Sequence, residues 1–138
     1  MSGNRIDAET ERAGEYPTTL RTRAHVFRSD VGAEDGSTDS APGAHDYFDA
    51  ALAACKSLTA MWYARRKGIP LERTEVHVER DATDERKGVY KLKVELTFVG
   101  PMSDEQRASL YRAVSACPVH KLMTTTDVQI EVVPVTPT

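Results

Sequence analysis

The sequence lacks any apolar run long enough to cross a membrane. Its longest strictly apolar run covers residues 50–55, whereas a membrane-spanning helix needs about 20 such residues. No apolar segment follows a basic one at the N-terminus, so the sequence does not predict a secretory signal. We therefore expect a cytoplasmic protein that does not enter a membrane.

An excess of positive charge is also missing. The 18 Lys and Arg residues are outnumbered by 21 Asp and Glu residues, which gives a formal net charge of -3. Nucleic acids and anionic membrane surfaces attract basic patches, so this balance predicts neither as a partner. With 138 residues, of which 40% are hydrophobic and 28% charged, the chain is typical of one globular domain.

Cysteine is scarce, because the chain contains only Cys55 and Cys117. In a reducing compartment, such cysteines serve more often as reactive thiols or core residues than as a structural disulfide. His120 follows Cys117 closely, but a structural zinc site usually takes four ligands in close pairs, and no second pair is present. The sequence therefore predicts no metal and no cofactor.

The N-terminal part of the chain differs from the rest in composition. Residues 1–18 are polar and aperiodic, which predicts a flexible N-terminal arm or an edge segment. We expect residues 19–138 to form a single domain. Within it, residues 20–28 have strand character. Residues 29–44 are rich in Gly, Asp, Ser and Pro, which predicts a long loop.

The clearest helix signal covers residues 47–64. Asp46 and Asp49 place negative charge in the first turn and residues 65–67 place positive charge in the last, as the helix dipole favours. Asp49 and Lys56 lie two turns apart on one face, which we expect to be solvated. The rest is apolar enough to require cover, partly from a second subunit. The predicted buried stripe consists of Phe48, Ala51, Leu52, Cys55, Leu58, Thr59 and Trp62.

The second half of the chain predicts a hairpin, a helix and a last strand. Apolar and polar residues alternate over residues 74–79 and 90–98, which indicates an antiparallel hairpin with one solvated face. Ser103 and Gln106 form a capping-box pattern, and the helix that it opens has an apolar stripe ending at Cys117. Pro118 either ends this helix or starts a new helical turn. Residues 128–132 alternate as a strand, so the predicted fold class is α+β.

Two segments of the sequence resemble a known family. Residues 45–72 contain Ala-Ala-Leu-Ala-Ala-Cys, which ends at Cys55, and the second segment is Cys-Pro-Val-His-Lys, which begins at Cys117. In this order they resemble the OsmC/Ohr superfamily, the osmotically inducible and organic hydroperoxide resistance proteins. The resemblance runs from Leu20 to Val133. It implies an OsmC-like fold, in which antiparallel sheets wrap around a long buried central helix, and an intertwined homodimer.

The resemblance also implies a thiol-dependent peroxidase of oxidative-stress defence. Such a protein reduces organic hydroperoxides, with hydrogen peroxide as a further substrate. Cys55 attacks the peroxide, Cys117 resolves the oxidised Cys55, and a dithiol reductant of lipoyl or thioredoxin-like type restores the pair. These roles agree with thiol chemistry, since a thiolate oxidised to sulfenic acid condenses with a second thiol to a disulfide.

In the family, an arginine from the N-terminal region activates the first cysteine and a glutamate holds that arginine. At the glutamate position this chain has Asp46, a shorter acid. Arg21, Arg23 and Arg28 are candidates for the arginine, and we favour Arg28 because it lies nearest the predicted loop. Whether Asp46 replaces the glutamate stays open. The departure resembles a less studied OsmC-like branch, and it bears on peroxidase efficiency more than on the fold.

Each candidate also has a purely structural interpretation. The cysteines suit core positions, Asp46 suits a helix start, and His120 suits a hydrogen bond to a carbonyl or to Cys117. The aromatic side chains of the first long helix fill either a core or a pocket for an alkyl tail. Two alternative functions follow, a non-catalytic protein that binds a small apolar ligand and a redox sensor that signals through a partner.

Overall fold

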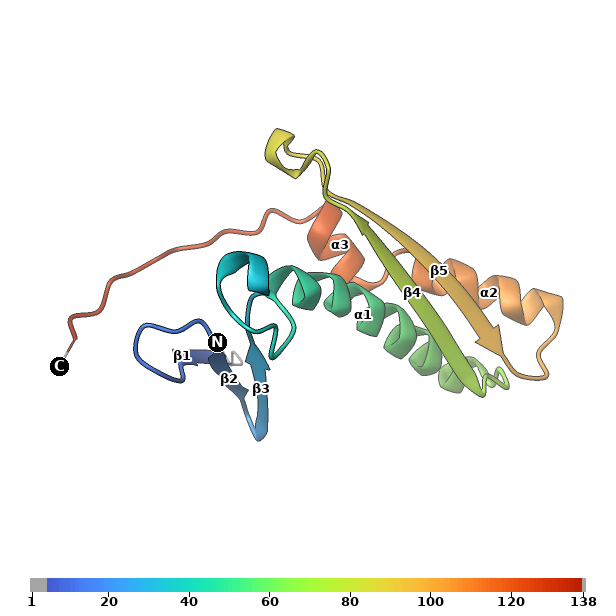
Figure 1. The fold of residues 1–138 in the computed structure, drawn as a ribbon. Helices are drawn as coiled ribbons and strands as arrows, with labels where there is room; N and C mark the ends of the chain where they lie inside the picture. The colour runs from blue at the N-terminus through green and yellow to red at the C-terminus, as the bar shows by residue number, and fades with distance from the viewer. Residues whose placement is uncertain (1–4, 138) are drawn as a thin grey trace. The chain divides into compact units, whose positions relative to one another are not determined.

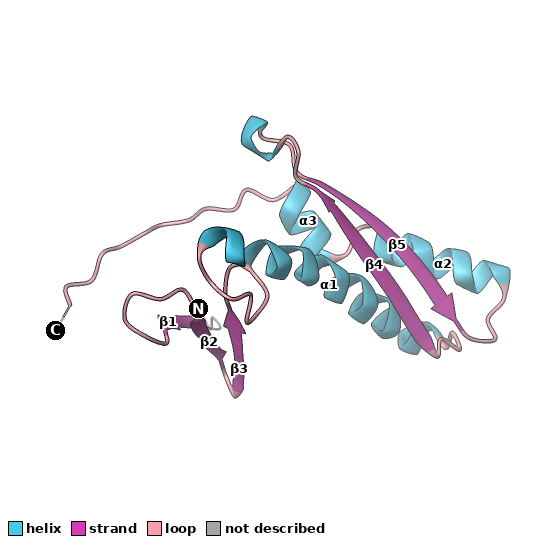
Figure 2. Cartoon of the chain, viewed as in Figure 1, coloured by secondary structure: helices cyan, strands magenta, loops and turns pink. Residues whose placement is uncertain are grey.

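The computed structural model describes residues 5–137, whose helices and strands are shown in Figure 1 and Figure 2. The strands are β1 (Asp7–Thr10), β2 (Thr18–Thr22), β3 (His25–Ser29), β4 (Arg73–Asp81) and β5 (Lys91–Val99). The helices are α1 (Ala44–Lys67), α2 (Asp104–Ser115) and α3 (Pro118–Thr124), with 3-10 turns η1 (Ala33–Asp35) and η2 (Glu85–Lys87). The strands pair antiparallel, which confirms the predicted α+β class. The described helices include none long and apolar enough to span a membrane.

The chain forms two compact units, and the first of them ends at Ala50. This unit contains an antiparallel sheet in the order β1-β2-β3, with Leu20 opposite Phe27 in the pairing of β2 with β3. The strand predicted over residues 20–28 is therefore a hairpin. The chain reverses at Arg23, which has a φ of 52°, because a residue in the left-handed region interrupts a strand and favours a turn.

A buried carboxylate holds the loop that follows β3. Asp30, 3% exposed, accepts hydrogen bonds from the Ser37 hydroxyl at 2.5 Å and from the amide and hydroxyl of Ser40 at 2.9 and 2.7 Å. The bonds from Ser37 and Ser40 favour the ionised carboxylate, so they hold the pKa of Asp30 well below its ordinary value. The predicted loop is confirmed, and its own polar side chains organise it.

Helix α1 contains the whole of the predicted helix and begins one turn earlier. The backbone N–H of Gly43 donates to Asp46 Oδ2 at 2.8 Å, which satisfies one of the amides that lack a partner at a helix start. At the other end, Gly68 has a φ of 67°. Glycine adopts this left-handed conformation readily, and helices commonly end on it.

The structure buries a different face of α1 from the one that the sequence pattern predicts. Asp49 and Lys56 are 9% and 3% exposed, and Ala60 on the same face is fully buried. Much of the predicted apolar stripe is open instead, with Leu58 71% and Trp62 60% exposed. The small alanine lets other elements approach closely. A helix that is apolar nearly all round does not reveal by its pattern which face packs within the chain.

The second unit, which begins at Ala51, packs a long hairpin with helices (Figure 1). Strands β4 and β5 pair from Arg73 opposite Val99 onward, which confirms the predicted hairpin. The Ser103 hydroxyl accepts from Gln106 N–H at 3.1 Å and the Gln106 side chain accepts from Ser103 N–H at 2.9 Å, so the capping box of α2 is confirmed. Each large buried side chain contributes about 2 kcal/mol to stability. The core consists of Ala60, Ala64, Ile69, Leu71, Phe98, Leu110 and Val114.

The strand predicted at residues 128–132 is absent from the single chain. Residues 127–137 contain no helix or strand, and Figure 2 draws this segment as loop. Its apolar side chains face solvent, with Ile130 82% and Val132 87% exposed. Alternation indicates a strand, but a strand also needs a neighbour for its backbone hydrogen bonds. The described part of the chain does not supply one at this position.

Gly100 lies where the chain leaves β5, and we predict that Gly100→Ala lowers the free energy of unfolding by about 2 kcal/mol or more. Its φ is 153°, and a Cβ there would meet the Pro70 carbonyl oxygen at 2.2 Å. Gly32→Ala is the matched control, because a Cβ at Gly32 meets nothing within 4 Å. Urea unfolding followed by circular dichroism measures both. Equal midpoints for Gly100→Ala and the parent would contradict the prediction.

Candidate functional site

The structure brings the two cysteines together in the second unit. Cys55 lies in the middle of α1 and is partly exposed, whereas Cys117 lies at the N-cap of α3 and is 1% exposed. Both are free thiols, and each shifts the pKa of the other, so the two side chains lie near each other. Because a disulfide requires close approach of two cysteines, this proximity is what a redox pair needs.

Helix α3 presents backbone N–H groups to both sulfur atoms. Pro118 is its first helical residue, so the helix starts abruptly after Cys117. Of the N–H groups that follow, that of Val119 donates to Cys55 Sγ at 3.4 Å and that of His120 donates to the sulfur of Cys117. Amides in the first turn of a helix have no partner within it. They are therefore free to stabilise negative charge on the thiols.

A buried cation lies beside these thiols. The Lys56 ammonium donates to the Val114 carbonyl at 2.6 Å and the Ser115 carbonyl at 3.3 Å, both in the last turn of α2. It also lies 2.8 Å from Nδ1 of His120. An ammonium has three donors and no acceptor, so Nδ1 is the acceptor of this bond. All three donors of Lys56 are thus satisfied.

The surroundings shift the two thiols in opposite directions. Burial raises the pKa of Cys55, but the Val119 amide, the Cys117 thiol, the Thr59 hydroxyl and the charge of Lys56 together outweigh it, so the net pKa is lowered. Burial also raises the pKa of Cys117, which stays raised because Cys117 donates its hydrogen bond to Cys55. Cys55 is therefore the thiol that ionises first, with Cys117 as its protonated neighbour.

The other two predicted site residues, Asp46 and Arg28, lie in the first unit. Asp46 accepts from the amide of Gly43, and Tyr47 donates to the carbonyl of Arg28. The Arg28 guanidinium forms a two-pronged ion pair with Glu11, at 2.8 and 3.1 Å. That pair lowers the pKa of Glu11. The carboxylate seen on Arg28 is thus Glu11, a residue that the sequence did not single out, and the catalytic roles of Arg28 and Asp46 stay predictions.

Sequence reasoning also missed Lys56 as a site residue. The charge pattern predicts that Lys56 lies on a solvated face, and the family resemblance points to an N-terminal arginine as the activating cation. A signal was present, because Lys56 directly follows Cys55 and is the only charged residue between Asp49 and Arg65. A charge at the centre of an apolar helix is either solvated or paired. Only the fold shows that it is paired.

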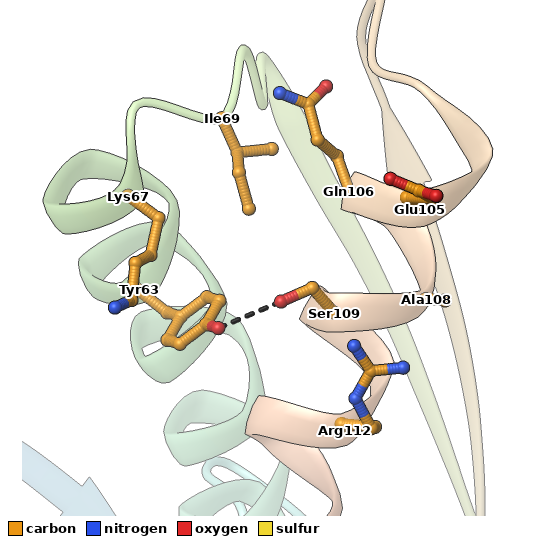
Figure 3. Close-up of a pocket in the computed structure, with 8 residues that line it drawn as sticks. All are labelled: Tyr63, Lys67, Ile69, Glu105, Gln106, Ala108, Ser109 and Arg112. Carbon is orange, nitrogen blue, oxygen red and sulfur yellow. Dashed lines mark hydrogen bonds between the residues drawn. The ribbon is translucent and has the colours of Figure 1, made fainter.

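The structure also contains an open pocket of about 530 Å³ between the end of α1 and α2, drawn in Figure 3. Tyr63 lines it and lies 2.8 Å from the Ser109 hydroxyl, with charged Lys67 and Arg112 beside them. Neither cysteine lines this pocket. The part of the chain that the structure describes contains no group of three or more His, Cys, Asp or Glu residues placed to hold a metal.

Comparison with known proteins agrees with this fold. A family model described as OsmC-like protein matches residues 36–133. An OsmC like protein from Mycoplasma pneumoniae has a TM-score of 0.71 at 19% identity, over 90% of this chain and 89% of that chain. The organic hydroperoxide resistance protein OsmC from Legionella pneumophila has a TM-score of 0.60 at 21% identity, over 91% of each chain. The organic hydroperoxide resistance protein OhrB of Bacillus subtilis has a TM-score of 0.52 at 21% identity, over 90% and 92%. No curated protein matches by sequence.

We predict that limiting iodoacetamide at pH 7 modifies Cys55 at least about tenfold faster than Cys117. Cys55 has the lowered pKa and is partly exposed, whereas Cys117 is buried and protonated. Lowering the pH through the thiol pKa values should therefore stop the reaction of Cys117 before that of Cys55. Peptide mass spectrometry measures both rates, with protein unfolded in urea as the reference for equal labelling. Preferential labelling of Cys117 in the folded protein would refute this assignment.

Proposed function

Because the chain belongs to the family of OsmC-like proteins, we propose that it is a thiol-dependent peroxidase that reduces organic hydroperoxides, and also hydrogen peroxide, in oxidative-stress defence. Its relatives include proteins described as organic hydroperoxide resistance proteins. The observation that carries the proposal is the proximity of the two thiols, where the amide of Val119, two residues after Cys117, donates to Cys55 Sγ at 3.4 Å, with the pKa of Cys55 lowered and that of Cys117 raised. A nucleophile and a resolving thiol need this difference.

The proposed reaction has three steps. The Cys55 thiolate attacks one peroxide oxygen, the O–O bond breaks, and the alkoxide takes a proton to leave as an alcohol while Cys55 becomes a sulfenic acid. The Cys117 thiol then attacks the Cys55 sulfur, so that a disulfide forms and water leaves. A dithiol of lipoyl or thioredoxin-like type reduces this disulfide by exchange and is itself oxidised. No cofactor enters the cycle.

The contacts of each sulfur support this division of roles. The Val119 N–H group, donating at 3.4 Å, and the Cys117 thiol both stabilise negative charge on Cys55. Cys55 is also the more open of the two, so a peroxide reaches it first. Cys117 is almost fully buried, and its nearness to Cys55 raises its pKa. It is therefore placed to react with Cys55 rather than with a molecule from solvent.

The remaining assignments extend the proposal beyond the thiols. We assign Arg28 the role of a further activating cation and Asp46 that of an orienting carboxylate, with Glu11 as the carboxylate that already pairs with Arg28. Free thiols and a dithiol reductant belong to a reducing compartment, so the proposed location is the cytoplasm. Nucleic acid and membrane are not proposed as partners.

We also propose that the working form is an intertwined homodimer. Leu58 and Trp62 form an apolar stripe along α1 that is open in the single chain. Ile130 and Val132 are exposed on a segment whose apolar and polar residues alternate as in a strand, but no other strand pairs with it among the described residues. Exposed apolar surfaces of this kind mark interaction sites. A second copy that covers the α1 stripe and pairs with residues 128–132 would bury both.

The peroxidase proposal predicts different outcomes for the two cysteines. Cys55→Ser should lose at least about 99% of the dithiol-dependent turnover of cumene hydroperoxide, because the attacking sulfur is gone. Cys117→Ser should still consume about one equivalent of peroxide but should not turn over with a dithiol, since no disulfide forms. Stopped-flow and coupled assays measure these rates. In the parent, one equivalent of hydroperoxide should remove two hydrogen atoms and link Cys55 to Cys117.

An unchanged thiol count after peroxide would reject the enzyme and favour the ligand-binding alternative. Disulfide formation that no dithiol reverses at a useful rate would favour the redox sensor. A Cys55→Ser protein as active as the parent would remove the basis of the mechanism, whatever the state of Cys117.

The dimer proposal predicts that the parent elutes at twice the 15.2 kDa of one chain and that Trp62→Glu dissociates it at micromolar concentration. Replacing the apolar ring at the interface by a charge removes apolar contact and buries a carboxylate, which costs several kcal/mol, about a thousandfold or more in the dissociation constant. Val89→Glu is the matched control, since Val89 is 44% exposed in the hairpin turn. Light scattering coupled to gel filtration measures the mass. A monomeric parent would disprove the dimer and leave the peroxidase proposal standing.

A further inference from the structure

We propose that Lys56 is the positioning residue of the thiol pair: its buried ammonium fixes the Cys-Pro-Val-His turn against α1 and supplies the positive charge beside Cys55. The proposal rests on the proposed function only in taking Cys55 as the reacting thiol. It assigns to a lysine of the second unit a role that the sequence led us to seek among N-terminal arginines.

The burial of Lys56 requires compensation, and the structure provides it. At 3% exposure, the ammonium has left water, which is strongly unfavourable unless each donor finds an acceptor. The carbonyls of Val114 and Ser115 and Nδ1 of His120 are the three acceptors, at 2.6, 3.3 and 2.8 Å. The two carbonyls belong to the last turn of α2, where carbonyls lack helical partners and the helix dipole favours a cation.

Through these bonds the Nζ atom of Lys56 joins three helices. The backbone of Lys56 belongs to α1, its carbonyl acceptors end α2, and His120 lies in the first turn of α3. The segment between the carbonyls and the histidine contains Cys117 and Pro118. The position of the Cys117 sulfur relative to α1 is therefore set at both of its flanks by the same ammonium.

The His120 contact extends this control to Cys55. With His120 held by Lys56, the preceding residue Val119 points its N–H group at Cys55 Sγ at 3.4 Å. The amide of His120 itself donates to Cys117. One lysine thus sets the direction of the N–H donors on both sulfur atoms. A shift of α3 by a fraction of an ångström would weaken the bond to Cys55, because a hydrogen bond of 3.4 Å is already long.

The charge of Lys56 acts in the same sense as this positioning. It lowers the pKa of both Cys55 and Cys117, against the effect of burial. The titratable groups that act on Cys55 are Lys56, which follows it on α1, and Cys117 at the N-cap of α3. His120, in the first turn of α3, contacts Lys56. Among them, Lys56 supplies the positive charge. Removing the charge while keeping the side-chain volume should therefore leave more of Cys55 protonated at neutral pH.

The test is the pH dependence of Cys55 alkylation by iodoacetamide in the reduced protein, with Lys56→Met as the neutral variant and Lys56→Arg as the conservative rescue. We expect Lys56→Met to slow alkylation at pH 7 by about tenfold, and to match or slightly exceed the parent above pH 10, where the thiol is ionised in both. Lys56→Arg should stay within about threefold of the parent. Lys91→Met, which removes an exposed charge on β5, should leave the profile unchanged.

A loss of structure alone would have a different signature, since unfolding exposes the buried Cys117 and makes the two cysteines react at similar rates. A folded Lys56→Met protein with the parent profile would overturn the proposal. No step of this test involves peroxide. A shifted profile in a protein that consumes no hydroperoxide would therefore reject the peroxidase and leave the role of Lys56 intact.

Measurements on the unaltered protein keep the proposal testable if Lys56→Met fails to fold. Lys56 should resist reductive methylation at least about tenfold longer than exposed Lys91, because it is buried and fully hydrogen-bonded. The NMR signal of its ε-carbon should move as Cys55 ionises, and the nitrogen shift of His120 should identify Nδ1 as the acceptor. A Lys56 that is methylated as fast as Lys91, or a signal that ignores the ionisation of Cys55, would overturn the proposal.

Discussion

The second unit depends on a single buried charge. Lys56 carries an ammonium out of water, and the protein compensates it with the carbonyl ends of α2 and the ring of His120. An isolated charge in such a place would be strongly unfavourable, so the arrangement of α1, α2 and α3 is restricted to one that brings these acceptors together. The same arrangement places the two thiols near each other.

Helix α1 does not follow the usual division between a solvent-exposed polar face and a buried apolar face. The face that packs within the chain carries the charged Lys56, whereas Leu58 and Trp62 lie on the open face. In an ordinary monomer the apolar face packs inside and the charged face meets solvent. The physical reason is that the chain satisfies its buried charge with its own groups, while its apolar surface stays exposed, as the proposed second copy would require.

Local features of the fold could be predicted from the sequence because their causes are local. The capping box at Ser103, the glycine stop at Gly68 and the alternation of the β4–β5 hairpin each involve residues that are close in sequence or paired by a short turn. The prediction of a strand at residues 128–132 was wrong for the opposite reason. Its alternating pattern is local, but the neighbour that would make it a strand is not.

The candidate site was only partly predictable, because its determining contacts join distant segments. The acceptors of Lys56 lie more than fifty residues further along the chain, and no periodicity in α1 points to them. The ion pair of Arg28 with Glu11 joins two segments of the first unit that are separated in the sequence. The spatial proximity of Cys55 and Cys117 was suggested by the family resemblance and not by their spacing in the sequence. Such contacts become visible only when the fold is known.

The proximity of the sulfur of Cys117 to that of Cys55 has a consequence for damage. A sulfenic acid that must wait for its partner thiol can meet a second peroxide and pass irreversibly to sulfinic acid. In this fold the buried Cys117 lies beside Cys55, so the proposed mechanism would link the two sulfur atoms soon after Cys55 is oxidised. A peroxidase built this way would resist hyperoxidation, which would suit it to defence better than to sensing.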